Sequence, residues 1–522
     1  MTGFAAASGR IVGALLLFAA VAMPSVAELQ NVSIGGDVRI RGRYWGNMRT
    51  TPRSTSVHIP AAWLPGRAIG DPRGAAGRYG WDDRDNARKL IEHRTLLDVR
   101  ADFTGDVSAF ARLEAYALWG DNFRGDHITG ADRRATTDRD LEFIEAYIQT
   151  QNVFGLPLRV RIGRQTMRFG KGWLLGDASP STNAIIHDGI RLTYDAEPFV
   201  VDAFWSKLGE NGIREEDGDV DFYGVHATYA GFEPLSIAAY WYLVRDARAL
   251  SDTNFVWFAE WLEDALGLDD YDVTNQHTVG VRLNGGHGGF DYDLELAYQF
   301  GNADAVGARF RPLLYGDPDA EYDAWAGDLE VGYRFDVAWQ PRVYLGGAYF
   351  EGEDNRSLSL LDWINPFDQP RASVSFNRSF SSRQYSPILD PEEHMSNLYQ
   401  IRGGVGASPT EKLSASLELA HYGVVAPFDR PATFNAFGFA IPIAPALSFL
   451  TEESSRDLGF TTHLILRYDY TEDLMFRSGW EHLFTGKGAE DGSFVDYSGL
   501  GFGGGSAGDD ADYFFGETRI SF

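Results

Sequence analysis

The chain has 522 residues, no cysteine, 14% aromatic residues, 58 glycines and a formal net charge of −28. The absence of cysteine excludes disulfides, thiolate nucleophiles and cysteine-ligated metal sites. So acidic a chain also argues against nucleic acid as a partner, because nucleic-acid binding needs clustered Lys and Arg. Such a length would ordinarily predict two or three soluble domains.

The first 27 residues have the pattern of a secretory signal. Their only charge is Arg10, which is followed by the apolar run 11–22 and by Ser25-Val26-Ala27, a small-residue cleavage pattern. The apolar run is too short to span a bilayer as a helix. The sequence therefore predicts a signal peptide over residues 1–27 and a single mature domain over residues 28–522.

Segments with alternating side chains then recur along the chain. In one of them Phe290, Tyr292 and Leu294 alternate with Asp291 and Asp293. Such a period-2 pattern over about ten residues fits a tilted strand that crosses the hydrocarbon of a bilayer. The clearest segments are 38–43, 96–103, 108–119, 290–300, 328–335 and 458–470. Weaker ones are 142–150, 158–167, 189–195, 199–207, 221–230, 235–245, 277–284, 342–352, 397–407, 412–423 and 473–484.

The connections between these segments alternate between short and long without a break. The short ones are 105–106, 152–157, 195–198, 231–234, 285–289, 337–341, 408–412 and 471–473. The long ones are 46–90, 120–139, 168–188, 208–220, 246–276, 301–325, 353–396, 424–456 and 485–510. Long structureless loops are uncommon in a compact soluble domain, whereas an outer-membrane barrel has short periplasmic turns and long outer loops. The sequence predicts an all-β, up-and-down antiparallel transmembrane barrel of about 18 strands in the bacterial outer membrane.

The last segment, 510–522, fits the closing strand of such a barrel. Phe514, Ile520 and Phe522 lie on one face, and Glu517 and Arg519 on the other. We expect the apolar face to contact outer-membrane lipid and lipopolysaccharide. We also expect the terminal Phe522 to be recognised by the barrel-assembly machinery.

Polar strand faces point inward, so the lumen can be inferred from the sequence. Many arginines lie on these faces, whereas most acids lie in loops, for example Glu215-Glu216-Asp217 and Asp269-Asp270. Guanidinium groups along a water-filled path favour an anion-selecting pore. In the alternative interpretation these groups pair across strands and brace the wall. The predicted pore-lining residues are Arg39, Arg41, Arg43, Arg94, Arg100, Arg112, Glu145, Arg159, Arg161, Arg191, Arg282, Arg334, Arg402, Arg467 and Arg477. We expect no cofactor or metal site, except that divalent cations could bridge the acidic outer loops to lipopolysaccharide.

The stretch from Asp140 to Pro198 resembles the alginate-export family of outer-membrane porins. It reads DLEFIEAYIQTQ, then LRVRIGRQTMRFGKGWLLGD, then HDGIRLTYD, with Gly163-Arg164-Gln165 as its most specific part. The resemblance implies an 18-stranded barrel that exports a polyuronate through an arginine-rich constriction, with Arg164 as a pore residue beside Arg159 and Arg161. Strand parity places Arg164 with the outward Val160 and Ile162, so a bulge near Gly163 would be needed to turn it inward.

The chain also departs from that family. The family member built for alginate has a long periplasmic plug loop before its last two strands, and here that joint is only Thr471-Glu472-Asp473. Export of an alginate-like anionic saccharide and a general or anion-preferring diffusion porin for small solutes both stay open. The apolar segment 434–450 could constrict the lumen, dock on lipid or contact another protein, and its prolines argue against a spanning strand.

Two other classes of barrel are less favoured by the sequence. A barrel enzyme would need a nucleophile and base, and the only suggestive group is Tyr385, Ser386 and His394 in one loop. A structural or adhesive barrel would show no conductance. We therefore predict a channel and not an enzyme.

Overall fold

The architecture was determined from a computed structural model of the chain. It describes residues 28–47, 87–119, 141–178, 184–210, 219–247, 273–302, 321–352, 373–378, 380–390, 393, 396–427, 455–491 and 510–522, and the backbone of residues 429–430, 432–436, 439–443 and 452–453. The predicted signal peptide and the acidic loop clusters near residues 215–217 and 269–270 lie outside the described residues.

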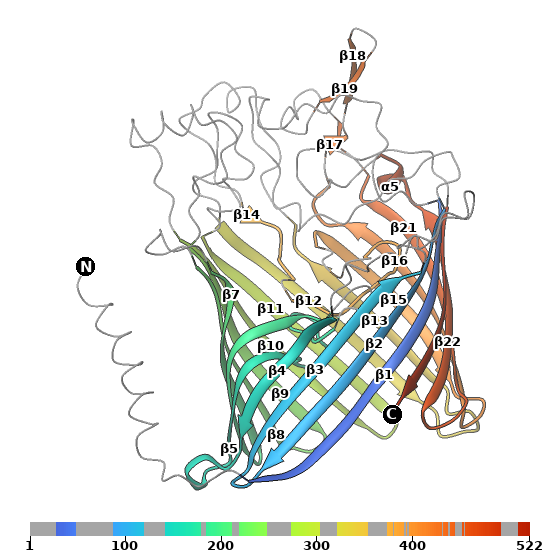
Figure 1. Ribbon diagram of the computed structural model, residues 1–522. Helices are drawn as coiled ribbons and strands as arrows, with labels where there is room; N and C mark the ends of the chain where they lie inside the picture. The colour runs from blue at the N-terminus through green and yellow to red at the C-terminus, as the bar shows by residue number, and fades with distance from the viewer. Residues whose placement is uncertain are drawn as a thin grey trace, which may run out of the picture.

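Eighteen antiparallel strands form one closed barrel (Figure 1). Each pairs with the barrel strands before and after it in the chain, which confirms the predicted up-and-down barrel. The strands are β1 (Leu29–Gly46), β2 (Arg88–Phe103), β3 (Val107–Leu118), β4 (Leu141–Thr150), β5 (Leu158–Thr166), β6 (Ile186–Ala196), β7 (Phe199–Gly209), β8 (Val220–Phe232), β9 (Leu235–Asp246), β10 (Thr274–His287), β11 (Phe290–Asn302), β12 (Glu321–Arg334), β13 (Arg342–Phe350), β15 (Leu398–Ala407), β16 (Leu413–Val424), β21 (Asp457–Asp469), β22 (Leu474–Thr485) and β23 (Ala511–Ser521).

The barrel closes between its first and last strands. β1 and β23 pair from Asp37 opposite Ser521 to Gly46 opposite Asp512. Beyond that ladder the Gly36 amide donates to the Phe522 carbonyl at 3.0 Å, and the Phe522 amide donates back at 3.1 Å. Closure satisfies the backbone groups that an open sheet edge would leave unpaired in hydrocarbon.

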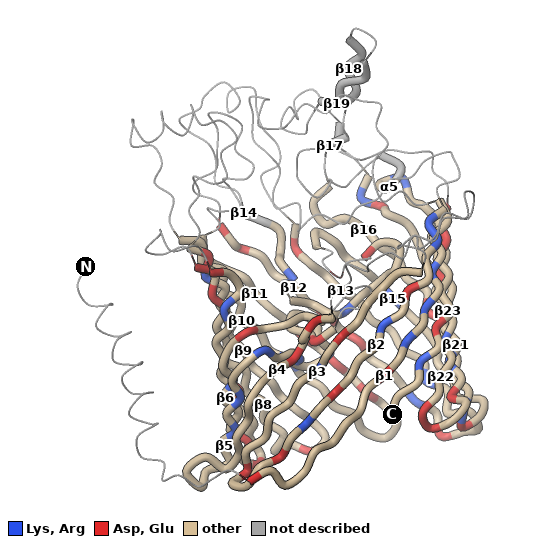
Figure 2. The backbone as a smooth tube through the Cα atoms, in the orientation of Figure 1, with Lys and Arg blue, Asp and Glu red and all other residues tan. Residues whose placement is uncertain are grey.

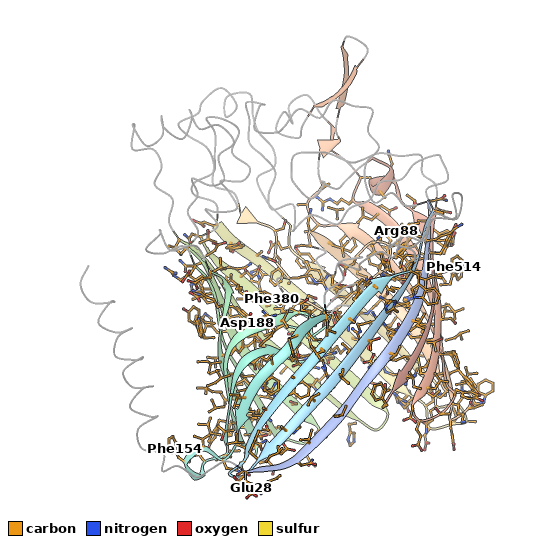
Figure 3. All side chains as sticks on the ribbon, viewed as in Figure 1. Glu28, Arg88, Phe154, Asp188, Phe380 and Phe514 are labelled. Atoms are coloured by element: carbon orange, nitrogen blue, oxygen red, sulfur yellow. The ribbon has the colours of Figure 1, made fainter. Side chains whose placement is uncertain are left out.

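Short turns lie at one end of the barrel and long connections at the other, as predicted. The turns joining β2 to β3, β6 to β7 and β10 to β11 are only two or three residues long. Figure 3 labels Glu28 and Phe154 at the turn end, and Arg88 and Phe514 toward the loop end. All nine long connections fall within a few residues of their predicted positions.

The two faces of the wall differ as strand alternation requires. Outward positions expose large apolar side chains, including Ile34, Leu345 and Ile401. Inward positions bury polar ones, including Arg39 and Gln400. Among the described residues, no helix is long and apolar enough to cross a membrane.

The remaining elements lie in the connections. They are η2 (Val153–Gly155), β14 (Ser373–Val374), β17 (Asp429–Arg430), β18 (Ala432–Ala436), β19 (Phe439–Ile443), β20 (Glu452–Glu453) and α5 (Lys487–Asp491). β18 and β19 pair only with each other, and Figure 1 shows this hairpin beyond the loop end, away from the lumen. The described part of the segment 434–450 therefore does not form the constriction, and its remainder lies outside the described residues.

Candidate functional site

The structure places nearly all the predicted pore residues on the inner face of the wall. Their inward direction follows from the register, because each shares its strand face with buried polar positions such as Asp37, Gln149 and Thr193. Whether they bind a substrate stays a prediction. The inward residues are Arg39, Arg41, Arg43, Arg94, Arg100, Arg112, Glu145, Arg159, Arg161, Arg191, Arg282, Arg334, Arg402, Arg467 and Arg477.

Arg164 is the exception. It pairs in register with Ala146 on β4 and with Asp188 on β6, beside the exposed Ile162. Its guanidinium donates to both carboxylate oxygens of Asp188, at 2.8 and 2.9 Å. The ladders on both sides of β5 pass through Gly163 without a shift, so no bulge turns the side chain inward. The structure therefore corrects the expectation from the family resemblance and places Arg164 on the outer face.

Two loop-end segments fold back into the lumen and narrow it. The first is residues 167–178 after β5, and the second consists of the described residues 373–378, 380–390, 393 and 396–397 before β15. Their side chains are buried, with Trp173 1% exposed and Phe376, Ile388 and Leu389 fully buried. Phe380 lies inside the barrel, well below the loop rim (Figure 3). These two segments, called here the lumen segments, occupy part of the barrel interior, and we infer that they form the constriction.

Backbone hydrogen bonds join the two lumen segments. The Phe380 amide donates to the Leu174 carbonyl at 3.3 Å, and the Gly176 amide donates to the Phe380 carbonyl at 2.9 Å. The Ser382 amide donates to the Gly172 carbonyl at 2.9 Å. A Cβ atom at Gly176 would lie 2.0 Å from the Ser382 hydroxyl and 2.8 Å from its backbone nitrogen. The close approach of the segments therefore requires glycine at this position.

The second lumen segment is fastened to the wall by a buried tyrosine. The Tyr385 hydroxyl donates to Asp328 on β12 at 2.7 Å and accepts from the Trp173 indole nitrogen at 3.0 Å. The same hydroxyl thus links both lumen segments to the wall. Burial raises the pKa of Tyr385 above its ordinary value, and the nearby Asp328 carboxylate raises it further. The phenol therefore stays a hydrogen-bond donor at neutral pH.

Further polar contacts fix the second segment. The Ser386 hydroxyl donates to Glu481 on β22 and accepts from the amides of Ile388, at 3.1 Å, and Leu389, at 2.9 Å. This network accounts for Ser386 as a structural residue. His394, the third member of the group considered for an enzyme, lies outside the described residues.

Charges at this contact are paired. Arg402 on β15 lies 3.2 Å from Asp328 and 3.2 Å from Glu330. Within the segment, the fully buried Arg378 donates to Asp390 at 2.9 Å. Burial acts to lower the pKa of Arg383, but the Asp328 carboxylate and other neighbours outweigh it and the pKa is raised. The segment is therefore held by buried ion pairs, although the Nε atom of Arg383, 3.9 Å from Asp328, has no hydrogen-bond partner.

The wall around the β1–β23 closure carries an excess of arginine. Figure 2 shows the Lys and Arg positions that recur on these strands. Five guanidinium groups there face three carboxylates, which leaves a formal excess of 5 − 3 = +2 on this part of the wall. The cations are Arg39, Arg41, Arg43, Arg94 and Arg477, called here the arginine face, and the acids are Glu92, Glu114 and Glu517.

Several donors of the arginine face are unsatisfied. The Nε atom of Arg39 lies 4.0 Å from Glu517, and that of Arg94 lies 3.9 Å from Glu114, too far for hydrogen bonds. Both Nε atoms are buried without a partner. Among the described residues, Arg477 has no carboxylate within 4.0 Å and contacts the Phe515 ring at 5.2 Å.

The wall across the lumen is electrically balanced. Inward positions of β10–β16, together with Lys171 and Arg383 of the lumen segments, carry six acids and six cations. The acids are Asp291, Asp293, Glu295, Asp328, Glu330 and Glu418, and the cations are Lys171, Arg282, Arg334, Arg342, Arg383 and Arg402. This part of the wall therefore carries no excess of cations, in contrast to the arginine face.

Sequence reasoning missed the lumen segments. It identified residues 168–188 and 353–396 as long outer connections and did not predict their burial. A signal was present, because Trp173-Leu174-Leu175 and Ile388-Leu389 are apolar runs inside otherwise polar loops. Large apolar side chains grouped in a loop favour burial against another part of the protein.

A known protein family and several solved structures are similar to this chain. Residues 79–496 match the protein family described as alginate export. No curated protein matches the chain. Among solved structures, the chain is similar to OccAB1 of Acinetobacter baumannii, with 8% identity, 94% of this chain and 97% of that chain covered, and a TM-score of 0.50. OprD of Pseudomonas aeruginosa gives 11% identity, coverage of 95% and 97%, and a TM-score of 0.48. The family match extends over more than half of the sequence and includes both lumen segments, and the chain therefore belongs to the alginate export family of outer-membrane β-barrel proteins.

Proposed function

We propose that this outer-membrane channel passes anionic saccharides, of which a polyuronate such as alginate is the leading candidate, along its arginine face. The observation that carries the proposal is the excess of arginine on the arginine face, where several guanidinium donors have no partner. Arg39 and Arg94 each have a buried Nε without an acceptor, and Arg477 has no carboxylate within 4.0 Å among the described residues.

Uronate chemistry matches these donors. Each uronate residue carries one carboxylate, and guanidinium groups bind carboxylates through charge-assisted hydrogen bonds. The arginines lie at successive inward positions of one strand, Arg39, Arg41 and Arg43, with Arg94 beside them on β2. A chain of carboxylates could therefore move from one donor to the next. Nearby Glu92 and Glu517 limit the strength of each contact, and conduction requires that a bound anion can also leave.

The alternative is an anion-preferring diffusion porin for small solutes. One observation favours it: the constriction is built from lumen segments tied to each other and to the wall by buried hydrogen bonds. A constriction held in this way fits a fixed aperture better than a plug that withdraws to admit a polymer. The family match favours export, and it favours a channel over a barrel enzyme.

Single-channel current in a planar bilayer tests the proposal. The mature chain is measured under a KCl gradient, and oligouronates of increasing length are then added to one side. We expect an anion-selective reversal potential and a block that strengthens with oligomer length. Block independent of length would favour the small-solute porin, and no selectivity with no block would refute the proposal.

A matched pair of variants locates the effect. Arg477→Gln removes a positive charge from the arginine face, whereas Arg164→Gln removes the same charge from the outer face. We expect Arg477→Gln to weaken oligouronate block about tenfold, equivalent to about 1.4 kcal/mol, and Arg164→Gln to leave it unchanged. Equal effects of both variants would show that net charge, and not the arginine face, sets the preference.

A further inference from the structure

The outer surface of the barrel has an open groove where β1 meets β23. Its volume is about 510 Å³, and it extends from β23 across β1 to β2 and the end of β3. Gly42 and Gly516 lie at its floor, directly opposite each other in the ladder. The inward-facing Arg43, Leu90 and Phe515, which lie between the outward residues along their strands, complete the lining.

The floor is low because it lacks side chains. A Cβ atom built at Gly42 or at Gly516 would meet nothing within 4 Å. The register continues this row of small residues to Ser478 on β22, which lies opposite Gly516. The groove is therefore a gap in the apolar coat of the barrel that neighbouring side chains leave unfilled.

Apolar and aromatic side chains form its sides. The Tyr44 and Phe514 rings lie 6.0 Å apart across the β1–β23 ladder. Ile91 and Trp119 close the other side and are 41% and 57% exposed. These residues face outward, toward lipid, so the groove opens to acyl chains.

A cation stands at the loop-side end of the groove. The Lys89 ammonium lies 5.6 Å from the centre of the Tyr44 ring. The side chain is exposed, and among the described residues Lys89 has no carboxylate within 4.0 Å. Arg88, next to it at the start of β2, instead lies over the inward Trp45 ring at 5.5 Å. Lys89 is thus available to an anionic group at the outer surface.

We propose that this groove binds an acyl chain of a phosphorylated lipid of the outer leaflet, with the lipid phosphate beside Lys89. The position of the groove decides the occupant, because its floor faces lipid and its cationic end lies toward the loops. Lipid tails are as apolar as the groove, so selectivity arises from packing over the glycine floor and from charge at Lys89. The inference is independent of what passes through the lumen.

Native mass spectrometry of the full mature chain in detergent tests the site. The protein is titrated with dimyristoyl phosphatidylglycerol, which is anionic, and with dimyristoyl phosphatidylcholine, which carries no net charge, and bound lipids are counted. We expect tighter retention of one anionic lipid than of the neutral one. Equal retention of both would overturn the role given to Lys89.

Three variants distinguish the site from general lipid adhesion. Gly42→Leu fills the floor, where a Cβ atom would meet no neighbour within 4 Å, and should reduce retention of the first lipid at least fivefold. Lys89→Gln should abolish the preference for the anionic lipid and leave neutral-lipid binding intact. Ala227→Leu adds the same bulk to an outward position of β8 and should change nothing.

Two results would overturn the proposal. One is that Gly42→Leu retains the lipid as tightly as the native chain, or that Ala227→Leu lowers lipid retention as much as Gly42→Leu does. The other is a change of oligomeric state in Gly42→Leu with unchanged lipid retention, which would identify the groove as a contact between copies of the chain.

Discussion

Replacing Tyr385 with Phe tests whether the constriction is held by one buried hydroxyl. The variant removes a single oxygen, which donates to Asp328 at 2.7 Å and accepts from Trp173 at 3.0 Å. The ring remains, and with it the contacts to the guanidinium groups of Arg378 and Arg402, at 5.0 and 5.6 Å. The loss is therefore confined to two hydrogen bonds.

The size of the effect on segment docking depends on which buried polar groups lose a hydrogen-bond partner. A buried polar group that loses its partner costs about 1–3 kcal/mol. Here the Trp173 donor loses its acceptor, and Asp328 loses one donor but keeps Arg402. We estimate a loss of about 2–4 kcal/mol in the docking free energy of the second lumen segment, which raises the undocked-to-docked ratio roughly 30- to 1000-fold.

Single-channel recording detects this change. The native channel should show a steady current at constant voltage, whereas Tyr385→Phe should show frequent steps to higher conductance as the segment leaves the lumen. The thermal unfolding of the barrel should barely change, because every ladder between strands is intact. The selectivity of the docked state should also persist.

Tyr344→Phe is the matched control. The Tyr344 hydroxyl donates to Glu418 at 2.6 Å and so joins β13 to β16 within the wall. This variant removes the same atom from a half-buried tyrosine–carboxylate pair in the wall and leaves the lumen segments intact, so it should not add current steps. Identical current traces for Tyr385→Phe and the native chain would refute the reasoning.

Two further predictions concern the same segments. Gly176→Ala should raise the conductance, because its Cβ would lie 2.0 Å from the Ser382 hydroxyl and 2.8 Å from its amide nitrogen, so that the two lumen segments must separate. Gly406→Ala, where the nearest atom is 3.8 Å away, is the control, and equal conductance of the two variants would contradict the prediction. Ser386→Ala should speed hydrogen exchange at the amides of Ile388 and Leu389 at least tenfold, since both donate to the lost hydroxyl. Mass spectrometry of the peptide covering residues 385–390 measures this, and unchanged exchange would show that the turn holds without its cap.

The sequence by itself determined the barrel. Alternation with period 2 is local, so the segment 290–300 showed its two faces without reference to any neighbour. The alternation of short and long connections then required antiparallel strands in chain order, and an even strand count followed. The same parity placed Arg39, Arg402 and Arg477 inward.

Parity also gave the right answer for Arg164 when the family resemblance did not. The resemblance made Arg164 a pore residue, and only a bulge could have reconciled the two expectations. The structure shows an unshifted ladder through Gly163, with Arg164 bound to Asp188 outside. Because successive side chains of a strand point to opposite faces, a shift of one residue moves a side chain from the lumen to the outer surface.

Only the tertiary structure decided what fills the lumen and which arginines are free. Trp173 meets Tyr385 across 212 residues of sequence, and Tyr385 meets Asp328 across 57, so no local pattern records these contacts. Likewise, strand parity predicts only that Arg282 and Arg477 both face the lumen, and it does not distinguish a paired arginine from an unpaired one. Yet Arg282 donates to Asp293 at 2.5 Å, whereas Arg477 has no acid within 4.0 Å in the part of the chain that the structure describes. Pairing depends on which strands become neighbours and on side-chain reach across the ladder, and these are settled only when the barrel closes.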